Sequence, residues 1–185
     1  MKKQPQITEQ TKLALKTAFW ELYTQKPLEK ITIKDITDTA GYNRGTFYLY
    51  YKDVYDIFTQ VKDELLDKIE AVIQESLRNN DRFDLSEQMA VLVELMHTYK
   101  HYGIVLLSDR GDPRFTARLK EIIWPLLDRY FITSQGCNEY QMKILSEFYL
   151  SGIIAAVTKW NADPQMSIDQ FISFLVEKVF SSVSH

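Results

Sequence analysis

The sequence predicts an all-α protein in which a small three-helix head is joined by a long helix to a larger helical body. Apolar residues recur at spacings of three and four along most of the chain, which is the period of an amphipathic helix. Clusters of Gly, Pro, Asn and Asp separate these stretches. With 185 residues and 45% hydrophobic content, the chain can bury a substantial core in one or two domains.

The first helix is expected to run from Thr8 to about Thr24. Its apolar stripe consists of Leu15, Ala18, Phe19 and Leu22. Lys26-Pro27 stops it, because proline disfavours a helical conformation in the preceding residue. This helix should brace the two that follow.

Two short helices come next. Thr32 caps the first of them, which carries a stripe of Ile33, Ile36 and Ala40 and ends at Gly41. Asn43 caps the second, which begins at Arg44 and turns Phe47 and Tyr51 inward. Two short helices joined by a tight Gly-containing turn are typical of the helix-turn-helix motif that fits a DNA major groove. An ordinary helical hairpin is the alternative.

A family resemblance supports the DNA-binding interpretation. The residues that carry it are Thr32-Ile33, Ile36, Ala40-Gly41, Gly45-Thr46-Phe47-Tyr48 and Tyr51-Lys52. In order and spacing they resemble the N-terminal domain of the TetR/AcrR family of transcriptional regulators, over about residues 8–60. The resemblance implies an all-helical homodimer with a three-helix DNA-binding head and a divergent body that usually binds a small effector. Many members carry a Lys-Glu pair where this chain has Val54-Tyr55, so we expect Lys52 to take over that phosphate contact.

The expected DNA contacts surround the second helix of the motif. They are Thr32, Asn43, Arg44, Gly45, Thr46, Tyr48, Leu49, Tyr50 and Lys52. Thr46 and Leu49 should lie nearest to base edges, and Leu49 suits a thymine methyl group. The remaining polar and charged side chains should hold phosphates, and Gly45 should let the backbone approach one.

Charge is distributed unevenly along the chain. Residues 1–52 hold nine Lys/Arg and five Asp/Glu, a net +4. The rest holds thirteen basic and twenty acidic residues, a net −7, which together give the formal −3 of the whole chain. A basic head on an acidic body suits a protein that presents one end to phosphates. A chance asymmetry of solvated faces is the alternative.

Residues 53–185 are expected to form the body. Asp53 should cap a long helix to about Leu77, with Ile57, Phe58, Val61, Leu65, Ile69 and Val72 on its core face. Further helices are expected from Ser86 to about His101, from Asp112-Pro113 through Tyr130 with a kink at Pro125, and from Glu139 to Trp160. Ser167 and Gln170 form a capping box that starts the last helix. We therefore divide the chain into a DNA-binding domain, 1–52, and a dimerisation and effector-binding domain, 53–185.

The last two helices are apolar around much of their circumference, which predicts a second buried face. We expect it to pair with the same helices of a second copy about a two-fold axis. The interface residues would be Phe148, Gly152, Ala155, Ala156, Trp160, Phe171, Leu175 and Val179. A single thick core is the alternative.

The body is also rich in side chains that line apolar pockets. The candidates are Met89, Val93, Met96, His97, Tyr99, Phe115, Trp124, Phe148 and Tyr149. They predict a small, mostly apolar effector, although these residues also suit an ordinary core, and a partner protein could replace the small molecule.

Other sites are not indicated. His97 and His101 are four residues apart and follow Glu94, but the zincin pattern is absent and a solvated helix face explains them. No Walker loop, Rossmann glycine set or nucleophile elbow is present, so we expect no catalytic site, metal or cofactor. The single Cys137 suits a reducing cytoplasm. No signal peptide or membrane-spanning run is visible, so we expect a cytoplasmic protein without a membrane partner.

The sequence thus predicts a DNA-binding transcriptional regulator, an effector-responsive repressor that acts as a homodimer on an inverted-repeat operator of double-stranded DNA. An activator of the same fold and a helix-turn-helix module that binds a protein are the alternatives. The operator, the regulated genes and the effector are not specified by the residues.

Overall fold

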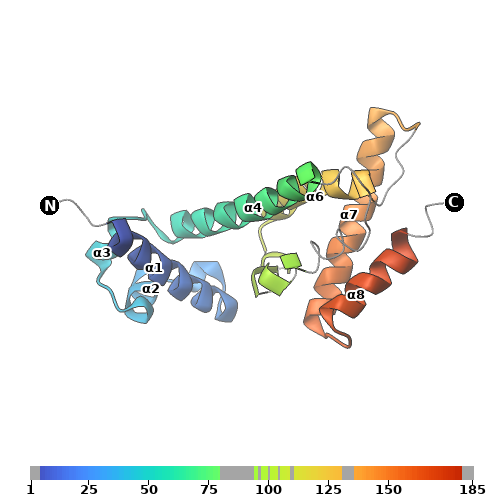
Figure 1. The fold of residues 1–185 in the computed structure, drawn as a ribbon. Coiled ribbons are helices and arrows are strands. Elements are labelled where there is room, and N and C mark those ends of the chain that lie inside the picture. Colours follow the sequence, from blue (N-terminus) through green and yellow to red (C-terminus); the bar gives the residue numbers. More distant parts are fainter. Residues whose placement is uncertain are drawn as a thin grey trace. The chain divides into compact units, whose positions relative to one another are not determined.

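The computed structural model describes residues 5–79, 94–95, 97–99, 101–103, 105–108, 111–130 and 136–180. Within these ranges every regular element is helical, as the apolar spacing predicted (Figure 1). The chain divides into two compact units, Met1–Leu65 and Leu66–His185. The division falls inside one continuous helix, Val54–Asn79.

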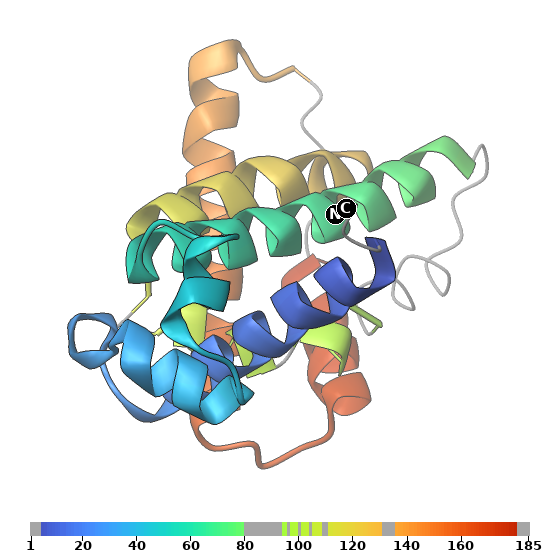
Figure 2. The same cartoon turned by 90° about the vertical axis from the view of Figure 1, so that its left-hand side faces the viewer.

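The first unit contains α1 (Pro5–Gln25), the 3₁₀ turn η1 (Leu28–Lys30), α2 (Ile33–Ala40), α3 (Arg44–Tyr48) and the first turns of α4 (Val54–Asn79). α1 packs against α2, and α2 against α3 (Figure 2). The core of this unit is aromatic and aliphatic. Its fully buried side chains include Leu15, Phe19, Ile36, Phe47, Tyr51 and Ile57. Burial of this apolar surface holds the two short helices, α2 and α3, in place, because helices of one or two turns are not stable alone.

Local signals set both ends of α2 and the start of α3 where the sequence placed them, whereas α1 begins at Pro5 and not at the expected Thr8. The Thr32 hydroxyl accepts a hydrogen bond from the Asp35 N–H, and the Asp35 carboxylate accepts one from the Thr32 N–H, which completes a capping box. At the other end of α2, Gly41 adopts φ 74°, a left-handed conformation that glycine reaches without strain. The Tyr42 N–H then donates to the Thr37 carbonyl at 2.9 Å, which closes the turn into α3.

α4 is one helix of 26 residues. The Asp53 carboxylate accepts the Asp56 N–H at 2.8 Å, which confirms the expected cap. The buried face differs from the expected one at two places: Leu66 is buried as well, and Ile73 is fully buried whereas Val72 is only partly buried. A helix with 3.6 residues per turn drifts away from a strict spacing of three and four, which moves the buried stripe by one residue here.

The second unit is built from the rest of α4, α6 (Pro113–Tyr130), α7 (Glu139–Ala162), α8 (Ile168–Leu175) and a π-helical turn, Val176–Phe180. The rings of Trp160 and Phe171 stack with their centroids 5.1 Å apart, and the Trp160 indole N–H donates to the Met166 carbonyl at 2.9 Å. Around this pair lies a buried cluster of Leu127, Leu150, Ile168, Ile172 and Val176.

Several sequence predictions for this unit need adjustment. The helix from Ser86 was expected to end near His101, but the Leu107 N–H donates to the Gly103 carbonyl at 3.0 Å, so helical hydrogen bonding is found beyond that point. The π-helical turn was not predicted, nor was the capping box in which Asn138 and Gln141 start α7. Most of the helix expected from Ser86 lies outside the described residues. The capping box of α8, by contrast, is confirmed.

Candidate nucleic-acid interface

α3 presents two opposite faces. Phe47 and Tyr51 are 0% and 2% exposed, whereas Tyr48 and Leu49 are 58% and 62% exposed. The helix is shorter than predicted, since it ends at Tyr48, although the Tyr51 N–H still donates to the Phe47 carbonyl at 3.0 Å. Aromatic packing on the inner face therefore fixes α3 and leaves its outer face for contacts with another molecule.

Asn43 holds the first turn of α3. Its side-chain oxygen accepts the Thr46 N–H at 2.9 Å and lies 3.3 Å from the Thr46 hydroxyl. A Cβ atom at Gly45 would come within 3.1 Å of the same oxygen. Gly45 therefore makes room for the capping side chain, a structural reason for glycine that the sequence did not reveal.

The start of α2 is fixed by a second polar cluster. Asp35 Oδ2 accepts the Thr32 N–H at 2.9 Å and lies 2.8 Å from the Lys26 ammonium. Lys26, followed by the Thr32 N–H, lowers the pKa of Asp35 to about 2. The carboxylate is therefore ionised, and Thr32 is held at the exposed start of the helix, where the sequence predicted a phosphate contact.

The described cations of residues 5–52 fall into two groups. Ion pairs with carboxylates engage Lys12, Lys16, Lys26 and Lys34. Lys30, Arg44 and Lys52 are exposed and take part in none of the ion pairs among the described residues. Lys30 was not among the DNA contacts expected from the sequence, although its position two residues before a helix cap could have suggested such a role.

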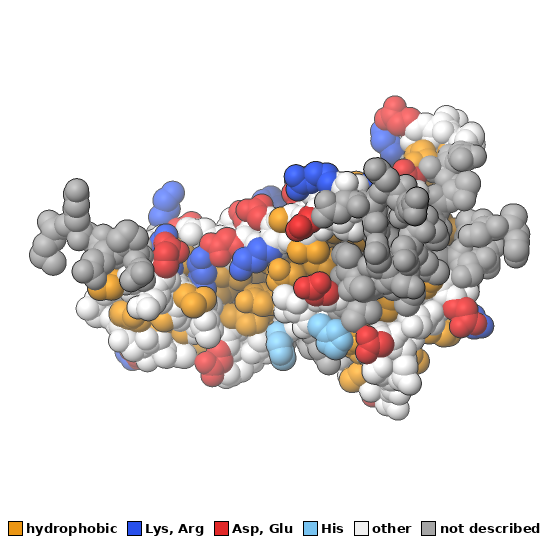
Figure 3. Space-filling model, viewed as in Figure 1, with side chains coloured by type: hydrophobic (Ala, Val, Ile, Leu, Met, Phe, Trp, Pro, Cys, Tyr) orange, Lys and Arg blue, Asp and Glu red, His pale blue; other side chains and the backbone are white. Residues whose placement is uncertain are grey.

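Acidic and basic side chains are interspersed over much of the molecular face seen in Figure 3. The net +4 of residues 1–52 already includes the carboxylates that engage Lys12, Lys26 and Lys34, so only the pairing of Lys16 with Glu64 reduces it further. Lys30, Arg44 and Lys52 are the cations of this group that best suit direct contact.

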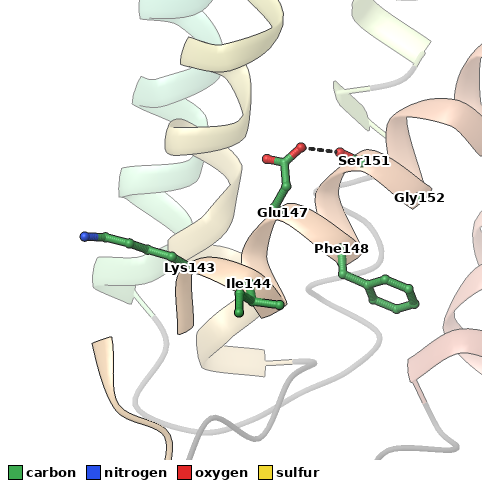
Figure 4. A pocket seen from close by; sticks show the side chains of 6 residues that line it. All are labelled: Lys143, Ile144, Glu147, Phe148, Ser151 and Gly152. Carbon is green, nitrogen blue, oxygen red and sulfur yellow. Dashed lines mark hydrogen bonds between the residues drawn. The ribbon is translucent and has the colours of Figure 1, made fainter. Parts of the chain in front are cut away.

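A shallow apolar depression lies on α7, and the side chains that line it all come from that helix (Figure 4). They are Lys143, Ile144, Glu147, Phe148, Ser151 and Gly152. Phe148 is 72% exposed, and a Cβ atom at Gly152 would meet no atom within 4 Å. In the single chain this face of the helix is therefore uncovered.

The expected dimer-interface residues separate into two sets. Phe148, Gly152 and Ala155 are exposed, and Ala156, Leu175 and Val179 are partly buried. Trp160 and Phe171 are 7% and 5% exposed because they stack on each other inside the chain's own core. These two residues therefore do not belong to a surface that a second copy can reach.

The expected pocket residues that the structure describes differ in their burial. Met89, Val93 and Met96 lie outside the described residues. Phe115 is buried, Trp124 and Tyr149 are partly buried, and burial raises the pKa of the partly buried Tyr99. His97 and Phe148 are exposed, so neither lines an enclosed cavity.

The described part of the chain carries neither a cluster of metal-ligating side chains nor a membrane-spanning helix. No group of three or more His, Cys, Asp or Glu side chains there has a geometry that could hold a metal ion. Among the described helices, none is both long and apolar enough to span a membrane.

Two family models match the chain. Residues 16–61 match the model described as bacterial regulatory proteins of the tetR family, and residues 84–180 match the one described as a transcriptional regulator C-terminal region. Two Bacillus subtilis (strain 168) proteins, the uncharacterized HTH-type transcriptional regulators YxbF and YvdT, are 21% and 28% identical over 112 and 91 residues. These matches cover 59% and 49% of this chain but only 30% and 47% of the length of those relatives.

Solved structures share the whole fold. The TetR transcriptional regulator from Streptococcus agalactiae 2603V superposes with a TM-score of 0.68 at 23% identity, over 95% of this chain and 96% of that one. FadR from Bacillus subtilis, in complex with stearoyl-CoA, gives 0.69 at 16% identity, over 92% and 98%. With both the helix-turn-helix head and the C-terminal region accounted for, the chain belongs to the TetR family of DNA-binding transcriptional regulators, which is not a family of enzymes.

Proposed function

We propose that this protein is a homodimeric repressor that binds an inverted-repeat operator and leaves it when an effector binds the body. The outer face of α3 carries this proposal: Tyr48 and Leu49 are exposed there, while Asn43 and the buried Phe47 fix the helix below them. Because it acts on DNA, we place it in the cytoplasm.

The roles of the contacting residues follow from their positions. Leu49 and Thr46 face base edges, with Leu49 against a thymine methyl group. Thr32, Arg44, Tyr48, Tyr50 and Lys52 contact phosphates, as do the backbone near Asn43 and Gly45. We add Lys30 to this group because it is exposed and belongs to none of the ion pairs among the described residues.

The dimer is supported by an exposed apolar stripe on α7. Tyr140, Ile144 and Phe148 recur at intervals of four and are 72%, 52% and 72% exposed. Gly152 and Ala155 continue the stripe with small residues, which allow close approach of a second helix. An exposed apolar stripe of this kind is unfavourable in water. Pairing it with the same stripe of a second copy about a two-fold axis would bury both. The two recognition helices would then reach successive major grooves about 34–36 Å apart.

The effector is proposed to be a small apolar molecule bound in the body. Phe115, Trp124, Tyr149 and Tyr99 supply aromatic surface, and Met89, Val93 and Met96 fall in the same part of the sequence. The stearoyl-CoA in the similar FadR structure carries a long apolar acyl chain, and that chain, not the charged CoA group, resembles such a ligand. A partner protein that binds the body is the alternative.

The test is selection of bound fragments from random and genomic DNA, followed by titration of the selected duplex at several salt concentrations. A repressor of this class should yield an inverted repeat, and its affinity should fall steeply as salt is added. A promoter–reporter assay with the selected sequence then separates repression from activation. Failure to select any DNA would instead favour a head that binds protein.

A further inference from the structure

Two carboxylates lie on α2, Asp35 and Asp38, close to the exposed cap of that helix. Negative charges near a phosphate backbone repel it, so their presence in a DNA-binding head needs an explanation. Each is paired with a lysine, Asp35 with Lys26 and Asp38 with Lys34. The two pairs differ in where the lysine comes from.

The Lys26–Asp35 pair connects two elements. Lys26 follows the last residue of α1, and its own N–H donates to the Leu22 carbonyl at 3.0 Å, so its backbone is anchored. The side chains of Lys26 and Asp35 are 31% and 35% exposed. Lys34 and Asp38 lie one turn apart within α2, with side chains 65% and 61% exposed, and such solvated pairs contribute little.

Asp35 is shared between the ion pair and the helix cap. Its Oδ2 atom accepts both the Lys26 ammonium and the Thr32 N–H, and its own N–H donates to the Thr32 hydroxyl at 3.1 Å. The position of Thr32 therefore depends on a carboxylate whose charge and orientation depend on Lys26. Lys30, which precedes the cap by two residues, lies on the same short connection.

We propose that Lys26 is a positioning residue of the DNA interface: it neutralises Asp35 and holds the start of α2 in place, so that Thr32 and Lys30 meet a phosphate that Lys26 itself does not touch. This inference rests on the proposed contacts of the head with duplex DNA. It also gives two neighbouring lysines different roles: Lys26 positions the start of α2, and Lys30 contacts a phosphate directly.

The experiment is a double-mutant cycle on the full chain. The variants are Lys26→Met, Asp35→Asn and their combination, and the probe is a random-sequence DNA duplex at fixed low salt. Lys26→Met should weaken binding about tenfold, because it leaves Asp35 as an unpaired charge facing the phosphates. Adding Asp35→Asn should restore most of that loss, and Lys26→Arg should retain wild-type affinity. Circular dichroism at the assay temperature confirms that each variant is folded.

Two control series make the result specific. The matched cycle of Lys34→Met and Asp38→Asn should show little coupling, because that pair is solvated. Lys30→Met should weaken binding by the same factor with or without Asp35→Asn, as expected of a direct phosphate contact. If Lys26→Met behaves like Lys30→Met, or leaves affinity unchanged, Lys26 is not a positioning residue. If the unmutated protein binds no duplex at all, the proposed function falls as well.

Discussion

The Tyr51 ring packs against Phe47 at a centroid distance of 5.4 Å, yet its hydroxyl is buried without a hydrogen-bond partner among the described residues. The ring contributes to the core that fixes the recognition helix. The hydroxyl adds the cost of burying an unpaired polar group.

Tyr51→Phe should therefore raise the free energy of unfolding, by about 1 kcal/mol at neutral pH. Burial raises the pKa of Tyr51 above its unfolded value of about 10. The contribution of the neutral hydroxyl to folding stability is therefore fully present below about pH 10 and is lost as pH rises further. The advantage of the variant should thus grow above pH 10. Denaturant unfolding at pH 7 and pH 10.5 measures both effects, and a destabilised variant would mean that the hydroxyl has a partner.

Gly111→Ala should destabilise the second unit by more than about 2 kcal/mol. A Cβ atom at this position would overlap the carbonyl carbon and oxygen of Leu106, which are backbone atoms that cannot move aside. Gly103→Ala is the matched control, since its Cβ would make only ordinary contacts at 3.9 Å. Thermal unfolding of both variants should show a large loss for Gly111→Ala alone.

Asp35→Asn should lower stability at pH 6 but not near pH 2. The pKa of Asp35 is lowered from 3.8 to about 2, so its contribution is present above pH 3.8 and lost as pH falls through 2. Unfolding followed at pH 6, 4 and 2 should show the wild type and the variant converging in acid. A gap that stays constant would mean that the ionised carboxylate is not what stabilises the cap.

Gly152→Arg should give monomers. A long charged side chain at a close helix crossing would bury an unpaired charge, at a cost of about 3–5 kcal/mol in dimer affinity. Sedimentation should show the monomer, and operator affinity should fall with it. Thr59→Arg, at an exposed position of α4, carries the same change without that burial and should stay dimeric. A Gly152→Arg dimer would place the interface elsewhere.

Tyr48→Phe should weaken binding to specific and random DNA by a similar factor, about tenfold, because the lost hydroxyl is assigned to a phosphate. Thr59→Val removes a hydroxyl from an exposed position of α4 and serves as the control. Fluorescence anisotropy with the two duplexes separates the effects. A change of sequence preference at constant random-DNA affinity would assign Tyr48 to base reading.

Sequence reasoning was most successful where structure is decided locally. The Thr32, Asn43 and Ser167 caps and the αL glycine at Gly41 depend on neighbours within four residues, so their patterns are visible in the chain itself. The inward direction of Phe47 and Tyr51 follows from helical spacing in the same way.

Contacts between elements were less predictable. α7 is apolar around most of its circumference, so its sequence does not show which side faces the protein's own core, and Trp160 was assigned outward although it stacks on Phe171. The Lys26–Asp35 pair joins residues nine apart across a turn, outside the spacing of neighbours on one helix. Such pairs can be identified only when the three-dimensional path of the chain is known.

The continuity of α4 bears on how such proteins can be recombined. Lys16 of α1 pairs with Glu64, well past the last residue of the helix-turn-helix motif, and the compact units divide only after Leu65. A fragment cut at residue 52 would lose that partner, along with the Phe58 ring, which packs against Phe19 and Tyr23 of α1. A chimera that transfers this head to the body of another family member should therefore be joined within α4, beyond Leu65 and in helical register. The transferred DNA-binding head then keeps the α4 residues that pack against it.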